Sequence, residues 1–161
     1  MHPIELRPIS KQDFDLVRHI QVTDDQTLYS GTILQAFNSP ETDLDFHAIF
    51  AEDRTVGFFK IDRGFGVKND FARDGEIGLR GFMIDINQQG KGLGRTAACA
   101  LRDYLPNLYP SAPSIALLVD MINPAAYACY AKAGFVDTGE LLSKGLTGPQ
   151  HIMRMSLSQT A

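Results

Sequence analysis

The chain has no tryptophan and only two cysteines, Cys99 and Cys129. Each cysteine lies in an alanine-rich segment of helical character, which favours a small buried apolar residue over a disulfide or a metal ligand. No metal is therefore expected. The sequence also lacks an N-terminal apolar segment and any apolar run long enough to cross a bilayer. These absences predict no membrane partner and favour a cytoplasmic, reducing location.

Positive charge is also scarce. The 161 residues include 15 Lys and Arg against 19 Asp and Glu, for a formal net charge of -4, and no basic run occurs. A nucleic-acid-binding protein usually carries a basic face, so no nucleic-acid partner is expected. With 44% hydrophobic residues and no linker or repeat, the sequence predicts a single soluble domain over 1–161.

Hydrophobic periodicity predicts an alternation of strands and helices. Helical patterns cover 10–20, 24–38 with an interruption near Gly31, a segment from Leu93 that ends near Pro106 and Pro110, and 123–134. A polar loop is expected at 66–75. Strand patterns cover 4–9, 43–53, 54–63, 76–86, 114–121, 135–142 and 151–157, with a hairpin turn between the second and third. This mixture predicts an α/β or α+β sheet domain.

The strand at 76–86 changes phase along its length. Ile77 and Leu79 share one face, whereas Phe82 and Ile84 follow after a shift of one residue. Strand side chains alternate strictly, so such a shift predicts a β-bulge near Gly81. A strand buried on both faces is the alternative, because the residue between Phe82 and Ile84 is also apolar.

The segment "QQGKGLGRT", residues 88–96, places Gly90, Gly92 and Gly94 directly before a predicted helix. The first N–H groups of a helix lack internal partners, and glycines let an anion approach them closely. Lys91 and Arg95 add positive charge. The spacing excludes the P-loop of nucleotide-hydrolysing enzymes and the dinucleotide-binding fingerprint. The pattern predicts a phosphate site, with a ligand-free glycine turn as the alternative.

Two motifs resemble those of the GNAT family of N-acetyltransferases. "QGKGLG", residues 89–94, matches the family signature Q/R-x-x-G-x-G/A, and residues 123–135 contain N-x6-Y-x3-G-F. The resemblance covers most of the chain and is most specific over 76–136. It implies a mixed, mostly antiparallel central sheet of about seven strands, flanked by about four helices, with a β-bulge in the fourth strand.

The resemblance implies acetyl-CoA as the cosubstrate. Met83 and Ile84 are the candidates for main-chain contacts to pantetheine, which adds to the bulged strand like an extra strand. Asn123 matches a position that contacts the cofactor in the family, although a helix N-cap is equally expected there. The residues implied at the pyrophosphate are Gln89, Gly90, Lys91, Gly92, Gly94 and Arg95.

The resemblance also assigns the acid–base chemistry. Tyr130 matches the family's general acid, which protonates the departing thiolate, and core packing is its alternative role. Several family members use a glutamate near the bulge as a base, but Arg80 stands there and cannot act as one. Glu76 and His47 are the remaining candidate bases, and a water chain to solvent is the default.

The expected acceptor is a primary amine of a small molecule. "DDQ" at 24–26 and "RGFMID" at 80–85 resemble bacterial spermine/spermidine acetyltransferases, so a polyamine is one option. An amino sugar, an antibiotic or the amine of a peptide or protein is another. An acyl-CoA-binding module without turnover is the competing function, and the oligomeric state stays open, with a homodimer as one option.

Overall fold

A computed structural model describes residues 3–143 and 148–157, which divide into two compact units. The first unit comprises Met1–Asp62 and Leu79–Ala97, and the second comprises Arg63–Gly78 and Ala98–Ala161. Hydrogen-bonded strands follow the order β1-β2-β3-β4-β5-β7-β6. Strand β4 (Ile77–Ile84) begins in the second unit and continues in the first, so each unit is described by itself below.

In the first unit, β1 (Ile4–Ile9), β2 (Leu44–Ala51) and β3 (Arg54–Asp62) form an antiparallel meander. Glu52 and Asp53 adopt positive φ angles of 51° and 68° between β2 and β3. Positive φ at both central residues belongs to the type I′ turn that matches the twist of a two-stranded hairpin. The predicted hairpin is therefore confirmed.

Short helices connect β1 to β2 in the same unit. Elements η1 (Lys11–Asp13) and α1 (Phe14–Val17) occupy the expected helix at 10–20, and α2 (Asp24–Ser30) and α3 (Ile33–Phe37) occupy 24–38, separated near Gly31 as predicted. Reciprocal capping boxes begin three of them, at Ser10, Thr23 and Thr32. Local side chains thus define where η1, α2 and α3 start.

An aromatic cluster fills the core of the first unit. The Phe37 ring lies 5.2 Å from that of Phe14 and 4.8 Å from that of Phe46, and Phe46 lies 5.5 Å from Phe58, all between ring centroids. These rings join α1 and α3 to β2 and β3. The other buried members are Val17, Ile20, Ile33, Ala36, Ala48, Phe50 and Met83.

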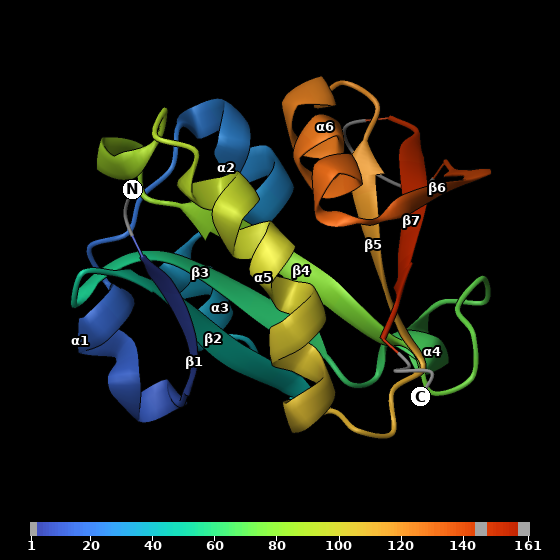
Figure 1. The fold of residues 1–161 in the computed structure, drawn as a ribbon, viewed down its shortest axis with the longest axis horizontal. Coiled ribbons are helices and arrows are strands. Elements are labelled where there is room, and N and C mark those ends of the chain that lie inside the picture. Colours follow the sequence, from blue (N-terminus) through green and yellow to red (C-terminus); the bar gives the residue numbers. More distant parts are fainter. Residues whose placement is uncertain (1–2, 144–147, 158–161) are drawn as a thin grey trace. The chain divides into compact units, whose positions relative to one another are not determined.

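In the second unit, β5 (Ser114–Asp120) pairs in parallel with the start of β4, at Ile77 with Ile115 and at Gly78 with Ala116. Strand β7 (Gln150–Ser156) lies antiparallel to β5 and to β6 (Val136–Leu142). Helix α6 (Pro124–Ala133) packs against β5 (Figure 1). The seven strands are mostly antiparallel, as expected.

The helices differ from the expectation in number and extent. The described residues contain six α-helices and two 3-10 helices rather than about four. Helix α4 (Phe65–Lys68) begins where a polar loop was predicted, because the buried Phe65 ring packs 5.7 Å from that of Phe71. Gly78 leaves room for that ring, since a Cβ there would overlap Phe65.

Helix α5 (Leu93–Leu108) ends between Pro106 and Pro110, as expected. Pro106 lies inside the helix, where the fully buried Leu101 and Leu105 hold the last turns in place. The expected burial of Cys99 was wrong, because Cys99 is exposed and Ala97 and Ala98 are the buried residues of this segment. The other cysteine, Cys129, is half-buried.

Gly81 interrupts the regular geometry of β4. Its φ of 62° lies in the left-handed region, which the glycine of a G1-type bulge adopts. This conformation supports the predicted bulge. Met83 is buried, whereas Phe82 and Ile84 are half-buried, so the strand after Gly81 buries apolar surface on both faces.

Candidate functional site

Hydrogen bonds fix the chain as it leaves β4 in the first unit. The buried Asp85 accepts a hydrogen bond from Gln21 N at 3.0 Å and donates its own N–H to Val56 O at 2.8 Å. Gln89 Nε2 donates to Ile84 O at 2.8 Å and to Gln26 Oε1 at 2.9 Å. Asp85 comes before η2 (Ile86–Gln88) and Gln89 comes after it. Their hydrogen bonds therefore fix the position from which the glycine segment begins.

Glycine at positions 90 and 92 is favoured by the backbone conformation and not by close packing. Gly90 and Gly92 have φ angles of 82° and 77°, and a Cβ at either position would meet no heavy atom within 4 Å. Any other residue would be strained there, and its side chain would occupy accessible space. Gly94 differs, because its Cβ would lie 3.4 Å from Ile84 Cγ1.

Helix α5 begins directly after this turn. Thr96 N donates to Gly92 O at 3.1 Å, which is the first bond of the helical ladder, so the N–H groups of 93–95 have no acceptor within the helix. The exposed Lys91 and Arg95 flank these groups, and Lys91 Nζ donates to Gln88 Oε1 at 3.0 Å. The arrangement can bind an anion through backbone amides and two cations.

Helix α6 of the second unit carries the other predicted site residues. Asn123 Oδ1 accepts from Ala126 N at 3.3 Å, so the N-cap role is confirmed and its amide nitrogen is the part that remains for a ligand. Tyr130 is half-buried, and its ring packs edge-on 5.8 Å from that of Phe135. Burial, with the Cys129 charge adding to it, raises the pKa of Tyr130. The phenol is therefore protonated at neutral pH.

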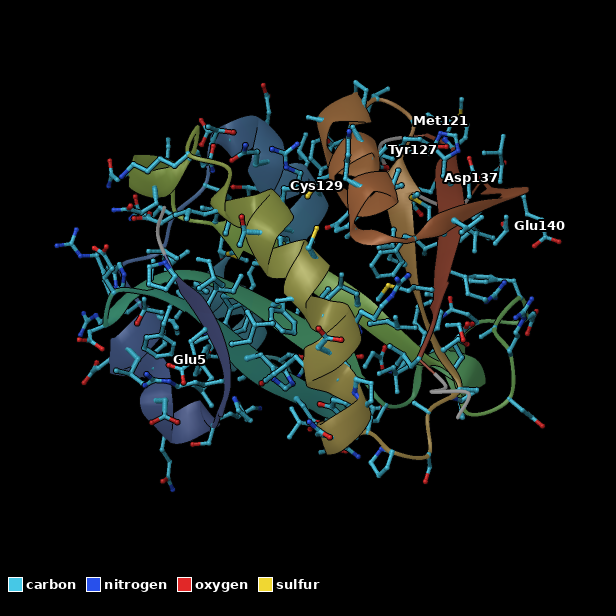
Figure 2. The ribbon with its side chains drawn as sticks, in the orientation of Figure 1. Glu5, Met121, Tyr127, Cys129, Asp137 and Glu140 are labelled. Atoms are coloured by element: carbon cyan, nitrogen blue, oxygen red, sulfur yellow. The ribbon has the colours of Figure 1, made fainter. Side chains whose placement is uncertain are left out.

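A polar cluster on the same helix was not anticipated from the sequence. Tyr127 Oη donates to Asp137 Oδ2 at 2.9 Å, and the labelled side chains can be followed in Figure 2. His151 Nδ1 lies 3.4 Å from the same oxygen, and its ring lies 4.8 Å from the Tyr127 ring. The Tyr127 hydroxyl thus ties α6 to β6, and His151 on β7 joins the same cluster.

The model of the acetyltransferase (GNAT) family matches residues 12–135. The chain belongs to the GNAT family. The match includes the glycine segment and reaches Phe135, so both motifs on which the resemblance was based lie within it. The comparison with curated proteins found no match.

Solved structures share the GNAT fold along nearly the whole chain. The aminoglycoside acetyltransferase AAC(6')-Ib in complex with coenzyme A and kanamycin is 21% identical, with 96% of this chain and 95% of that chain covered and a TM-score of 0.76. Spermidine N-acetyltransferase from Vibrio cholerae, in complex with CoA and spermine, is 18% identical over 96% and 95% of the chains, with a TM-score of 0.71. An uncharacterized protein from Bacillus halodurans is 14% identical over 96% and 84%, with a TM-score of 0.73.

Glu76 does not have the surroundings of a catalytic base. Its side chain is buried and accepts hydrogen bonds from Ser114 Oγ at 2.6 Å and from Arg154 Nε and Nη2 at 2.5 and 3.0 Å. Burial alone would raise the Glu76 pKa, but the bonds from Arg154, Ser114 and Arg73 N lower it below its ordinary value. A low pKa and full engagement in an ion pair make Glu76 a structural residue.

Glu76→Gln is accordingly expected to destabilise the second unit by about 3 kcal/mol, because it leaves the guanidinium of Arg154 without its charged partner. The wild-type contribution is present above pH ~4.5, the ordinary pKa, and disappears as pH falls through the lower folded-state pKa. Urea denaturation at pH 7 measures the loss. If Glu76 were instead the catalytic base, the substitution would sharply lower turnover per folded molecule and leave the stability unchanged.

His47 is an equally poor candidate base. It lies in the middle of β2, is buried, and stacks on Phe59 with ring centroids 4.9 Å apart and planes 4° apart. Burial lowers the pKa of His47 to about 4, despite the opposing effect of Asp45. The imidazole is therefore neutral at pH 7 and is a weak base. We therefore leave both Glu76 and His47 out of the proposed catalytic set.

Charged residues gather instead around Arg80, near Gly81. Arg80 Nη1 donates to Glu41 Oε1 and to Asp62 Oδ2, each at 3.1 Å, and Asp62 is buried. Lys60 lies beside them on β3. The sequence placed Arg80 where other family members use a glutamate, but the partners Glu41 and Asp62 come from other segments and gave no local signal.

Proposed function

We propose that the protein transfers an acetyl group from acetyl-CoA to a primary amine of a small molecule. The observation that carries the proposal is the GNAT family match over 12–135, together with a glycine turn at 90–92 whose backbone conformation and open surroundings suit a diphosphate. Solved relatives contain CoA with kanamycin or with spermine, which supports amines as the acceptor class.

We propose the following residues for cofactor binding. The backbone amides after Gly92, with Lys91 and Arg95, hold the pyrophosphate. Main-chain groups of Met83 and Ile84 bind pantetheine on the part of β4 that follows the bulge. Gln89 positions the turn through its bonds to Ile84 O and Gln26. The amide nitrogen of Asn123 is a further donor to the cofactor. Gly90 and Gly94 keep the turn free of side chains.

Acetyl-CoA supplies the acetyl thioester, and Tyr130 and water transfer the protons. Tyr130 Oη donates its proton to the thiolate that departs as the new C–N bond forms, and it regains a proton from solvent. The acceptor must lose a proton before it attacks, because only about one primary amine in a thousand is neutral at pH 7. With Glu76 and His47 engaged elsewhere, water takes that proton.

Acidic residues support a cationic acceptor. Asp24 and Asp25 open α2, and Asp43 and Asp45 lie where the chain enters β2, all in the first unit. Carboxylates spaced along a segment suit a polyamine or an aminoglycoside, both of which carry several ammonium groups. A polyamine-like acceptor is therefore the narrower proposal.

A thiol-release assay with acetyl-CoA tests the function. The panel contains spermidine, spermine, kanamycin and a short peptide with a free N-terminus. We expect amine-dependent release with at least one small polycationic amine. Activity on the peptide alone would favour a protein or peptide acetyltransferase.

Arg80 at the position of the family's glutamate favours a second function, an acyl-CoA-binding module. Cofactor binding without thiol release for any amine would establish that function.

A further inference from the structure

Lys60 is placed differently from the other lysines of the first unit. It lies on β3 opposite Phe46, and its side chain is half-buried. Its Cε atom lies 2.6 Å, and its Nζ atom 3.4 Å, from the position that a Cβ of Gly81 would take. The missing side chain of the bulge glycine thus leaves room for the lysine to lie against the backbone of β4.

The ammonium group of Lys60 has no hydrogen-bond partner in the part of the chain that the structure describes. Arg80 forms ion pairs with Glu41 and Asp62, the two nearby carboxylates. Lys11 and Lys91, by contrast, donate to Ser39 O and Gln88 Oε1, each at 3.0 Å. Lys60 therefore has a less stabilised positive charge than these exposed lysines.

Burial is the main factor that lowers the Lys60 pKa, and the Arg80 charge lowers it further, against the opposing effect of Glu41 and Asp62. A lower pKa increases the fraction of neutral amine, and the neutral amine is the nucleophile toward a thioester. Lys60 combines this reactivity with a position on β3 beside Gly81 of β4, the strand whose later residues are proposed to bind pantetheine.

We propose that Lys60 is a self-acetylation site, modified by acetyl-CoA bound to the same protein when no acceptor amine is present. The inference rests on the proposed function, because it needs acetyl-CoA beside β4. In the step, Lys60 Nζ forms a bond to the acetyl carbon and the carbon–sulfur bond breaks. The Lys60 ammonium loses one proton to water before the attack, CoA leaves as a thiolate that takes up the second proton from the nitrogen, and the neutral amide product keeps the third as its N–H.

Acetylation would remove one positive charge from the Lys60–Arg80 pair. The repulsion between the two cations then disappears, and the modified side chain fills the space beside Gly81 permanently. Self-acetylation would thus change the surroundings of the proposed acceptor amine and make the enzyme's activity depend on its history of exposure to acetyl-CoA.

Tryptic mass spectrometry tests the inference on the full chain incubated with acetyl-CoA alone. Unmodified protein is cut after Lys60, whereas acetylation leaves the uncut peptide 55–63 with the added mass of one acetyl group. We expect modification of Lys60 to exceed that of Lys132 by about tenfold or more, because Lys60 lies beside the bulge of β4, where the thioester is proposed to bind. Excess CoA, a competitor for the site, should suppress the modification.

Lys60→Arg and Lys132→Arg form a matched pair of variants. Both keep the charge, and only the first should abolish the dominant acetylation. Calorimetry with acetyl-CoA separates the two proposals. If the cofactor binds and Lys60 is modified no faster than Lys132, self-acetylation is overturned while the proposed function stands. If acetyl-CoA does not bind, both are overturned. Modification that CoA does not suppress would also overturn the inference, since it would arise without a bound donor.

Discussion

Gly92→Val is expected to abolish measurable acetyl-CoA binding, with a loss of at least about 100-fold, equivalent to ~2.8 kcal/mol. The φ of 77° strains any side-chain-bearing residue, and the space around the missing Cβ is open to the proposed diphosphate. A valine would push its methyl groups into that space and tilt the amides that follow. Isothermal titration calorimetry with acetyl-CoA measures the effect.

Gly139→Val is the matched control. Gly139 has a φ of 84° and equally open surroundings, but it lies in β6 of the second unit. The two variants therefore carry similar backbone strain, and only the Gly92 change places a side chain at the start of α5. If both proteins fold and bind acetyl-CoA with equal affinity, the assignment of the glycine turn to the pyrophosphate is wrong.

Tyr130→Phe is expected to lower kcat by about 100-fold or more while leaving the affinity for acetyl-CoA nearly unchanged. The substitution keeps the edge-on ring contact with Phe135 and removes only the hydroxyl that would protonate the thiolate. Because the pKa of Tyr130 is raised, no loss of activity from its ionisation is expected on the basic side of neutral pH. Steady-state rates with the best amine from the panel provide the measurement.

Tyr127→Phe on the same helix distinguishes chemistry from structure. It removes the hydrogen bond to Asp137, and we expect a loss of stability of about 1 kcal/mol with little change in kcat. Equal kcat values for Tyr130→Phe and the wild type would remove Tyr130 from the mechanism, provided that chemistry limits turnover. Equal losses in both variants would instead indicate that α6 had moved.

Local signals made much of the fold predictable. The strand expected at 4–9 coincides with β1, and the helix expected between Asn123 and Gly134 coincides with α6, where a capping side chain and a left-handed glycine mark the ends. Such signals depend on residues within a few positions of one another. They also located the glycine turn, because its backbone conformation follows from glycine itself.

Tertiary packing accounts for most of what the sequence did not predict. Pro106 is tolerated inside α5 because buried leucines hold the helix, and α4 forms because Phe65 packs where Gly78 leaves space. The ion pair that removes Glu76 from the list of bases involves Arg154, which lies 78 positions away in the chain. No local pattern reports such a partner, so the candidate bases could be named from the sequence but not assessed.

The separately capped helices between β1 and β2 have a consequence for how this protein could diversify. Each is far shorter than a helix that persists alone in water, yet each carries its own start signal at Ser10, Thr23 or Thr32. One turn can therefore be exchanged, lengthened or removed without redefining its neighbours or the strand register.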